Sequence, residues 1–287
     1  MSLPVIEVKD LTFSYNSLGT THTAIENVNL KIEKGELVGI IGHTGSGKST
    51  LIQHLNGLLK PNSGTVLIDG EDIFSKECDL RKIRFKVGLV FQYPEYQLFE
   101  ETVYNDIAFG PKNMGLSPDE IDKRVKEAAA FTGVEDYLNK SPFDLSGGQK
   151  RRVAIAGVIA MDPEILILDE PAAGLDPKGR DKILGQIKKY QREKGNTVLL
   201  VSHSMEDIAK LATKVLVMAD GKVEAYDIPE KIFADTERIE KIGLAVPQIT
   251  EVFEILKKNG IEIKESIFSV EYAKKVLLSL IGEGEDA

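Results

Sequence analysis

The sequence predicts an α/β fold in which helices cover both faces of a mostly parallel β-sheet. Short runs of leucine and β-branched residues, typical of buried parallel strands, recur along the chain with helical stretches between them. These runs lie at 36–42, 86–91, 164–170, 197–203 and 214–221. With 287 residues, the chain can build one main core and a small further region.

The first segment, residues 4–34, alternates apolar and polar side chains in short runs. A polar stretch from Asn16 to His22 interrupts the alternation and is expected to be a loop. A period of two on either side of a loop predicts antiparallel strands, which would form a β subdomain beside the main sheet.

A glycine-rich loop, GHTGSGKST, occupies residues 42–50 between a predicted strand and a predicted helix. It fits the pattern G-x-x-x-x-G-K-[ST], whose glycines let backbone N–H groups and a helix N-terminus face phosphate. Lys48 would reach the β- and γ-phosphates of a nucleotide, and Ser49 would give an oxygen ligand to Mg²⁺. His43 stands at a variable position, so its ring is expected to face solvent. The predicted nucleotide contacts of this loop are Gly42, His43, Thr44, Gly45, Ser46, Gly47, Lys48, Ser49 and Thr50.

The helix after this loop is predicted to turn Leu51, Leu55 and Leu58 or Leu59 toward the core and to stop before the turn KPNSG. Three helical stretches then follow within residues 94–163. This segment is too long for a simple crossover between strands, which predicts a helical subdomain.

Polar residues follow three of the predicted strands. Asp169 and Glu170 end ILILDE: Asp169 would be a second oxygen ligand of Mg²⁺, and Glu170 would polarise a water for in-line attack on the γ-phosphate. His203 and Gln92 end two other strands, where open α/β sheets bind ligands. His203 would sense the γ-phosphate, and Gln92 would reach the metal or the attacking water.

Two aromatic residues of the first segment are candidates for the adenine ring. Tyr15 could stack on adenine, and Phe13, two residues earlier on the same strand face, competes for that role. Packing in the core is the alternative for either ring.

A second glycine-rich turn, LSGGQ, occupies residues 145–149 before a predicted helix. Its amides can face an anion at the helix N-terminus, yet one nucleotide does not need two phosphate cradles from one chain. The glycine loop, Gln92, LSGGQ, ILILDE, GLD at 174–176 and His203 resemble, in order and spacing, an ATP-binding cassette (ABC) ATPase over about residues 4–225.

This resemblance implies that two nucleotide domains meet head to tail and that the second turn of one chain contacts the ATP held by the other. Asp176 would lie at the same contact between the two chains. One loop of each kind in one chain then implies half of a dimer. The residues carried over to this contact are Ser146, Gly147, Gly148, Gln149 and Asp176.

The stretch FQYPEYQLFEETVYNDIAFGPKNMGLS narrows the resemblance to the ATPase subunits of energy-coupling factor (ECF) transporters, of the A-prime type. That group imports vitamins and transition-metal ions. The implied partners are a sister ATPase, a transmembrane coupling subunit contacted through Tyr93–Phe99 and a substrate-binding membrane subunit. The resemblance implies a cassette at 1–228, a C-terminal dimerisation region at 229–287 and a place on the cytoplasmic face of the membrane.

Composition excludes several other classes. The net charge of −9 argues against a protein that mainly grips nucleic acid. A single cysteine, Cys78, excludes an internal disulfide and a cysteine metal cluster, and the longest apolar stretch, 153–161, is half of a bilayer span. A soluble ABC ATPase acting on nucleic acid or the ribosome is the alternative, and a P-loop kinase would leave LSGGQ without a role.

Overall fold

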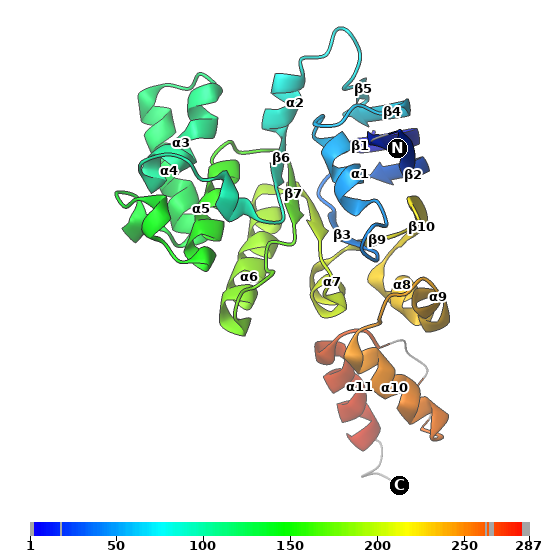
Figure 1. Cartoon of the computed structure of the whole chain (residues 1–287). Coiled ribbons are helices and arrows are strands. Elements are labelled where there is room, and N and C mark those ends of the chain that lie inside the picture. The colour runs from blue at the N-terminus through cyan, green and yellow to red at the C-terminus, as the bar shows by residue number, and fades with distance from the viewer. Residues whose placement is uncertain (1–2, 18, 262, 264–266, 283–287) are drawn as a thin grey trace.

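The computed structural model describes residues 3–17, 19–261, 263 and 267–282. Two β-sheets lie beside each other, with one group of helices flanking the main sheet and another at its foot (Figure 1). Within the described ranges, none of the helices combines the length and the apolar character needed to span a bilayer.

The main sheet has six strands in the order β10-β9-β3-β8-β7-β6. All are parallel except β10, which pairs antiparallel with β9 at the edge. Every residue of β3, β6, β7 and β8 is buried, which confirms the predicted buried runs. The strands are β3 (Leu37–Ile41), β6 (Val87–Val90), β7 (Ile165–Asp169), β8 (Thr197–Val201), β9 (Lys214–Ala219) and β10 (Lys222–Asp227).

The second sheet is antiparallel and has the order β2-β1-β4-β5. It confirms the predicted β subdomain, but the predicted loop at Asn16–His22 is wrong, because Asn16 still pairs with Thr21 in the ladder. Main-chain pairing joins Asn16 to Thr21 and Ser17 to Thr20, and because these residues are polar the alternation of apolar and polar side chains does not reveal the pairing. The strands are β1 (Ile6–Ser17), β2 (Thr20–Ile32), β4 (Ser63–Ile68) and β5 (Glu71–Asp72).

Helix α1 (Lys48–Leu55) follows the first glycine loop and packs between the sheets. Leu51 and Leu55 are fully buried, as predicted. The helix ends before Leu58 and Leu59; Leu58 is 43% exposed whereas Leu59 is partly buried, so of these two alternatives Leu58 is not the one that turns inward. Asn56 is the C-cap, and its side-chain amide donates to the carbonyl of Val87; Gly57 follows with φ +70°, a left-handed conformation that commonly ends helices.

A separate group of helices surrounds its own apolar cluster, at the left of Figure 1. The three predicted helical stretches are confirmed as α3 (Val103–Asn113), α4 (Pro118–Thr132) and α5 (Gly147–Ile159). One short helix lies between β5 and β6, one joins β6 to α3, and two lie between α4 and α5. They are α2 (Leu80–Lys86), η1 (Pro94–Gln97), η2 (Glu135–Tyr137) and η3 (Pro142–Asp144).

Of the remaining helices, those up to residue 241 pack on the other face of the main sheet, and the last two lie at its foot (Figure 1). Phe233 of α8 belongs to the main core, whereas Phe253 of α10 centres a small cluster of its own. The division into a cassette at 1–228 and a dimerisation region at 229–287 stays a prediction. These helices are α6 (Pro177–Lys194), α7 (Met205–Leu211), α8 (Pro229–Ala234), α9 (Thr236–Lys241), α10 (Gln248–Lys258) and α11 (Val270–Gly282).

Candidate functional site

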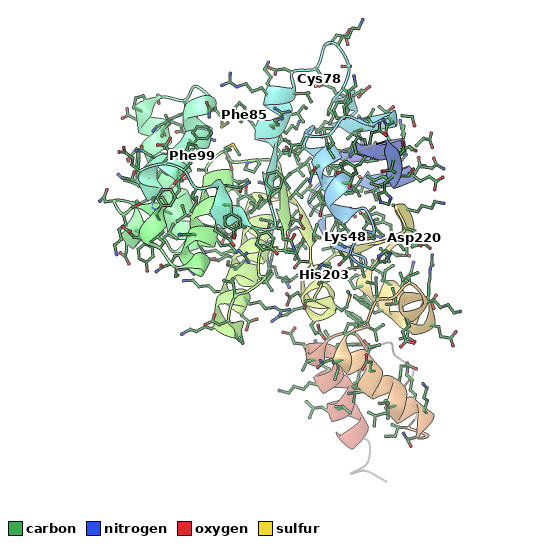
Figure 2. All side chains as sticks on the ribbon, in the orientation of Figure 1. Lys48, Cys78, Phe85, Phe99, His203 and Asp220 are labelled. Carbon is green, nitrogen blue, oxygen red and sulfur yellow. The ribbon has the colours of Figure 1, made fainter. Side chains whose placement is uncertain are left out.

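The candidate site lies where the parallel strands of the main sheet end. The glycine loop follows β3, Asp169 ends β7 and His203 follows β8, and these strands are neighbours in the order β3-β8-β7. Since parallel strands share one carboxyl edge, their terminal side chains meet there. The charge of Lys48 acts on the pKa of His203, and Figure 2 shows both side chains in the middle of the molecule.

The glycine loop needs glycine at its last turn. Gly47 has φ +98°, and a Cβ there would lie 2.6 Å from the carbonyl oxygen of Ala24. Gly47 also precedes α1 as its N-cap and has no side chain to occupy the first N–H groups of the helix. Those N–H groups therefore remain available to an anion.

Residues distant in sequence contact the backbone of the glycine loop. The N–H of Gly221, in the turn between β9 and β10, donates to the carbonyl of Ser46 at 3.2 Å. A Cβ on Gly42 would lie 2.3 Å from the carbonyl oxygen of Met218. The loop is thus shaped by β9 and its following turn as well as by its own glycines.

The ring of His43 lies against this support. Its Nε2 is 3.5 Å from Oδ1 of Asp220, and its Nδ1 is 2.9 Å from the carbonyl oxygen of Thr44. Figure 2 shows Asp220 close to the loop that carries Lys48. The His43 side chain is 34% exposed, so part of the ring faces solvent, and its role at the nucleotide stays a prediction.

Lys48 places a positive charge inside the glycine loop. Its side chain is buried, and Nζ donates to the carbonyl oxygens of Gly42 at 2.7 Å and His43 at 2.9 Å. Burial lowers the pKa of Lys48, and the carboxylates of Glu170 and Asp169 act against that shift. The ammonium is thus held where phosphate oxygens would meet it.

Ser49 and Asp169 meet beside the loop. The Ser49 hydroxyl donates to Oδ2 of Asp169 at 3.3 Å. Burial raises the pKa of Asp169, while the Ser49 hydrogen bond and Lys48 lower it. Both residues offer oxygen ligands, and Mg²⁺ commonly binds through one or two protein oxygens together with phosphates and waters. The pair fits a magnesium nucleotide.

Glu170 is a buried carboxyl with unused hydrogen-bonding capacity. Its φ is +52°, an unusual value for a residue with a side chain, and its side chain is 11% exposed. Within the described chain Oε1 accepts no hydrogen bond, and it lies 3.7 Å from Nε2 of His203. Burial, followed by the neighbouring Asp169, raises the pKa of Glu170 to about 7. A carboxylate with a pKa near the working pH suits a general base.

This raised pKa predicts a specific pH dependence of stability. The folded chain holds the Glu170 proton up to a pKa of about 7, against an ordinary value of 4.5, so stability from this group is present below pH 4.5 and lost as pH rises through 7. Glu170→Gln should therefore be more stable than wild type at pH 8, by up to about 3 kcal/mol, and similar at pH 4.5. Urea unfolding at both pH values measures this, and identical pH profiles would contradict it.

The other two predicted catalytic residues, His203 and Gln92, have more exposed side chains than Glu170. The His203 side chain is 55% exposed, and burial together with Lys48 lowers its pKa, which favours the neutral ring. The side chain of Gln92 is exposed, and its backbone carbonyl accepts a hydrogen bond from Arg151 at 3.4 Å. The structure thus brings His203 to Glu170, and it fixes Gln92 through the backbone.

The two aromatic candidates for stacking on adenine differ in their exposure. Phe13 packs on the main core and on the ring of His54, with ring centroids 4.8 Å apart. Tyr15 is 42% exposed, and its hydroxyl lies 3.3 Å from Oγ1 of Thr50 in α1. Tyr15 is therefore the ring available to a ligand, and its contact with adenine stays a prediction.

The second glycine-rich turn caps α5. Oγ of Ser146 accepts from the N–H of Gln149, and the Gln149 side chain accepts from the N–H of Ser146 at 2.8 Å. A Cβ on Gly147 would meet nothing within 4 Å, so its own described chain does not require glycine there. Asp176 caps α6 in the same way through the N–H of Gly179 at 2.7 Å. The roles of these residues at a second ATP stay predictions.

Two arginines next to the site were not predicted. Arg151 of α5 donates to backbone carbonyls of the Gln92 and Ala173 segments. Arg180 of α6 donates to Oδ2 of Asp207 at 2.9 Å and so ties α6 to α7, which follows His203. A charged helix residue is usually solvated, so the sequence gives no signal for either contact.

A mainly apolar hollow of about 260 Å³ lies between the Gln92 segment and the helices α3 and α5. Phe85 and Phe99, both labelled in Figure 2, line it together with Phe109 and Met161. Asp106 is at the same place, and its Oδ1 accepts from the N–H of Phe99 at 3.2 Å. The hollow is a candidate contact for another protein.

Comparison with known proteins agrees with this geometry. Residues 25–173 match the family model described as ABC transporter. The chain is 59% identical over 278 residues to the energy-coupling factor transporter ATP-binding protein EcfA2 of Clostridium tetani, covering 96% of each protein. It is 58% identical over 260 residues to EcfA2 of Clostridium perfringens, covering 90% of this chain and 91% of that protein.

Solved structures with the same architecture include cbiO1 of Clostridium perfringens, described as part of the ABC transporter complex cbiONQ. Its TM-score is 0.74 at 41% identity, over 88% of this chain and 100% of that one. A dimeric post-hydrolysis state of the ATP-binding cassette MJ0796, bound to ADP and Pi, gives a TM-score of 0.70 at 34% identity, over 78% of this chain and 98% of that one.

Proposed function

The chain belongs to the ABC transporter family and is an ATPase subunit of an energy-coupling factor transporter, and from this premise we propose that it is half of a head-to-tail dimer. Closure of this dimer on ATP would move the membrane subunits of an importer. The buried Oε1 of Glu170, which accepts no hydrogen bond within the described chain and lies near Lys48, Asp169 and His203, carries the hydrolytic part of this proposal, and the open Cβ position of Gly147 carries the dimer.

Each residue gathered at the carboxyl ends of the parallel strands then has one role. Lys48 holds the β- and γ-phosphates, and Ser49 and Asp169 hold the metal ion that accompanies the nucleotide. Mg²⁺ at that position neutralises phosphate charge. Glu170 accepts the proton of the attacking water, and neutral His203 donates a hydrogen bond to the γ-phosphate. Gln92 is the link between this site and the membrane subunits.

The second glycine-rich turn completes the site of the partner subunit. The N–H groups of Gly147 and Gly148 begin α5, so they have no partners within the helix and can face the γ-phosphate held by the other chain. A Cβ at Gly147 would meet open space in the described chain. The glycine is therefore required only if a group from outside the chain approaches this position, which supports the proposal. The partner is a sister ATPase, with which this chain forms a heterodimer.

The membrane coupling subunit binds at Tyr93–Phe99 and at the hollow beside it. Three aromatic side chains of this segment are strongly exposed: Tyr93 at 56%, Tyr96 at 84% and Phe99 at 58%. Exposed aromatic residues beside an apolar hollow are typical of protein interfaces. Glu95, in contrast, turns its carboxylate toward Arg151 and is 22% exposed. Tyr96 is therefore the better probe of docking.

Tyr96→Ala is expected to weaken assembly with the membrane coupling subunit by tenfold or more, since a central aromatic contact contributes on the order of 2 kcal/mol. Size-exclusion chromatography of the reconstituted complex in detergent, over a concentration series, measures this. Leu3→Ala is the control, because Leu3 is 74% exposed and lies outside the Tyr93–Phe99 segment. ATP binding should be unchanged in both variants. Normal assembly of Tyr96→Ala would place the docking surface elsewhere.

The location of the chain, the substrate of the importer and the role of the C-terminal region follow from its place among the energy-coupling factor ATPases. The chain lies on the cytoplasmic face of the membrane as a peripheral subunit, and the importer takes vitamins or transition-metal ions chosen by a small membrane subunit. The C-terminal region holds the two ATPases together, which is supported by exposed apolar side chains on α10 and α11: Val252, Ile255 and Leu278.

A further inference from the structure

Arg151 is an almost fully buried charge just outside the proposed catalytic site. It belongs to α5, two residues after LSGGQ, and is 5% exposed. The roles proposed above for ATP binding and hydrolysis do not use it.

The guanidinium of Arg151 joins three segments that are distant in sequence. One amino group, Nη1, donates to the carbonyl oxygen of Ala173, in the turn between Glu170 and Asp176. The other, Nη2, lies 3.4 Å from both the carbonyl oxygen of Gln92 and Oε2 of Glu95. The second glycine-rich turn, the catalytic turn and the docking segment therefore meet at one side chain.

Stability alone does not account for an arginine here. Burying a guanidinium costs free energy that its partners only offset, and an apolar side chain of similar volume is often as stable. What an arginine adds is a rigid planar fork with several donors, which fixes several acceptors relative to one another. Two of the three acceptors are backbone carbonyls, so the fork fixes the course of the chain in both segments.

We propose that Arg151 is a positioning residue that locks the docking segment and the catalytic turn to the start of α5. This inference rests on the proposed function. A displacement of Tyr93–Phe99 by the membrane subunit would then be transmitted at once to the catalytic turn and to the turn that faces the partner's ATP. The three segments move as one unit while Arg151 is present.

Hydrogen exchange of the full-length chain tests this lock without any activity. Arg151→Met removes the fork, and we expect peptides covering 92–99 and 171–176 both to exchange at least tenfold faster, since a charged hydrogen bond is lost in each. The peptide covering 42–50 should not change. Glu95→Gln should affect only 92–99, because the Ala173 contact remains, and Arg151→Lys should affect both peptides less than Arg151→Met.

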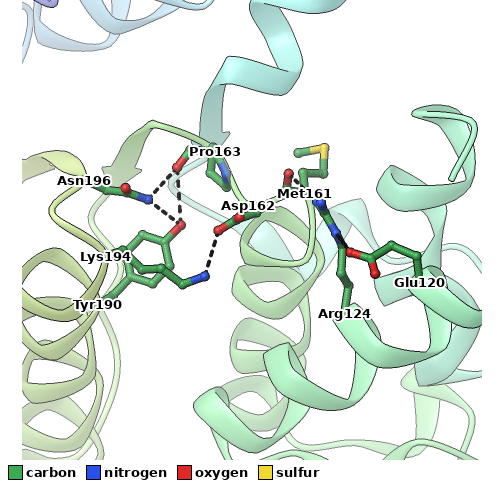
Figure 3. Close-up of polar contacts among 8 residues, drawn as sticks. All are labelled: Glu120, Arg124, Met161, Asp162, Pro163, Tyr190, Lys194 and Asn196. Carbon is green, nitrogen blue, oxygen red and sulfur yellow. Dashed lines mark hydrogen bonds and ion pairs between the residues drawn. The ribbon is translucent and has the colours of Figure 1, made fainter.

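Arg124→Met is the matched control. Arg124 also donates to a carboxylate and a backbone carbonyl, Oε1 of Glu120 at 2.9 Å and the oxygen of Met161 at 3.1 Å (Figure 3). Glu120 lies in α4 and Met161 just after α5, so neither partner belongs to the three segments. This variant should leave peptides 92–99 and 171–176 unchanged. Equal acceleration by Arg124→Met, or acceleration of only one peptide by Arg151→Met, would overturn the proposal.

Kinetics of the assembled ATPase dimer give the second readout. Because the described contacts of Arg151 are to the backbone of Gln92 and Ala173 and to the carboxylate of Glu95, and not to the glycine loop, we expect Arg151→Met to lower kcat at least tenfold with KM changed less than threefold. A rise in KM with normal kcat would contradict a positioning role. A wild-type dimer without ATPase activity would refute the proposed function, while the exchange experiment would still decide the role of Arg151.

Discussion

Glu170→Gln is expected to lower ATP turnover of the assembled dimer by at least about a hundredfold, because a positioned general base contributes on the order of 10² to 10⁴ in rate. The glutamine keeps the size of the side chain and cannot accept a proton from water. Lys48, Ser49 and Asp169 are untouched, so ATP should bind with nearly normal affinity. The dimer closed on ATP should then accumulate, because the step that reopens it is blocked.

Turnover of Mg-ATP and the mass of the complex, with and without the sister ATPase, measure both parts of this expectation. Glu164→Gln is the matched control: it lies next to the opposite end of β7, and its side chain is 51% exposed. It should hydrolyse ATP like wild type. Normal turnover of Glu170→Gln would remove Glu170 from the mechanism.

Gly147→Ala is expected to stabilise the isolated chain and yet impair the dimer. Alanine favours a helix over glycine by up to about 1 kcal/mol, and the added methyl group meets no atom within 4 Å in its own chain. In the ATP-bound dimer, the same methyl group would press against the phosphate of the partner's nucleotide. Overpacking of this kind costs about 1–3 kcal/mol, so ATP-dependent dimerisation and turnover should fall about tenfold or more.

Gly185→Ala provides the matched control in the same chain. Gly185 lies within α6, and a Cβ there also meets nothing within 4 Å. It should raise the thermal unfolding temperature without changing dimerisation or turnover. If Gly147→Ala behaved in the same way as Gly185→Ala, the turn at 145–149 would be a helix cap without a role at a second ATP.

The strand-end residues were predictable because their signals are local. Asp169, Glu170 and His203 each follow an uninterrupted buried strand, and parallel strands bring such ends together by geometry. Lys48 and Ser49 lie in a loop whose sequence pattern is typical of a phosphate-binding loop. For these residues, a few neighbouring positions carry most of the information.

Other features depend on partners far along the chain and were missed. β4 was not predicted, because it is short, half-exposed and held by pairing with β1. Arg151 stands in the charged run KRR, which is typical of a solvated helix face, and only the folded chain brings Gln92 and Ala173 around it. Asn56, the C-cap of α1, donates its side-chain amide to a carbonyl of β6, and only the folded chain brings this partner to it.

The support of the glycine loop by the turn after β9 has a consequence for synthesis of the protein. The loop is translated early, but the carbonyl of Met218 and the N–H of Gly221, which shape it from behind, emerge from the ribosome much later. A nascent chain that ends before Gly221 therefore has the whole phosphate-binding motif without its finished geometry. We therefore expect the subunit to bind its nucleotide only after most of its cassette has been made.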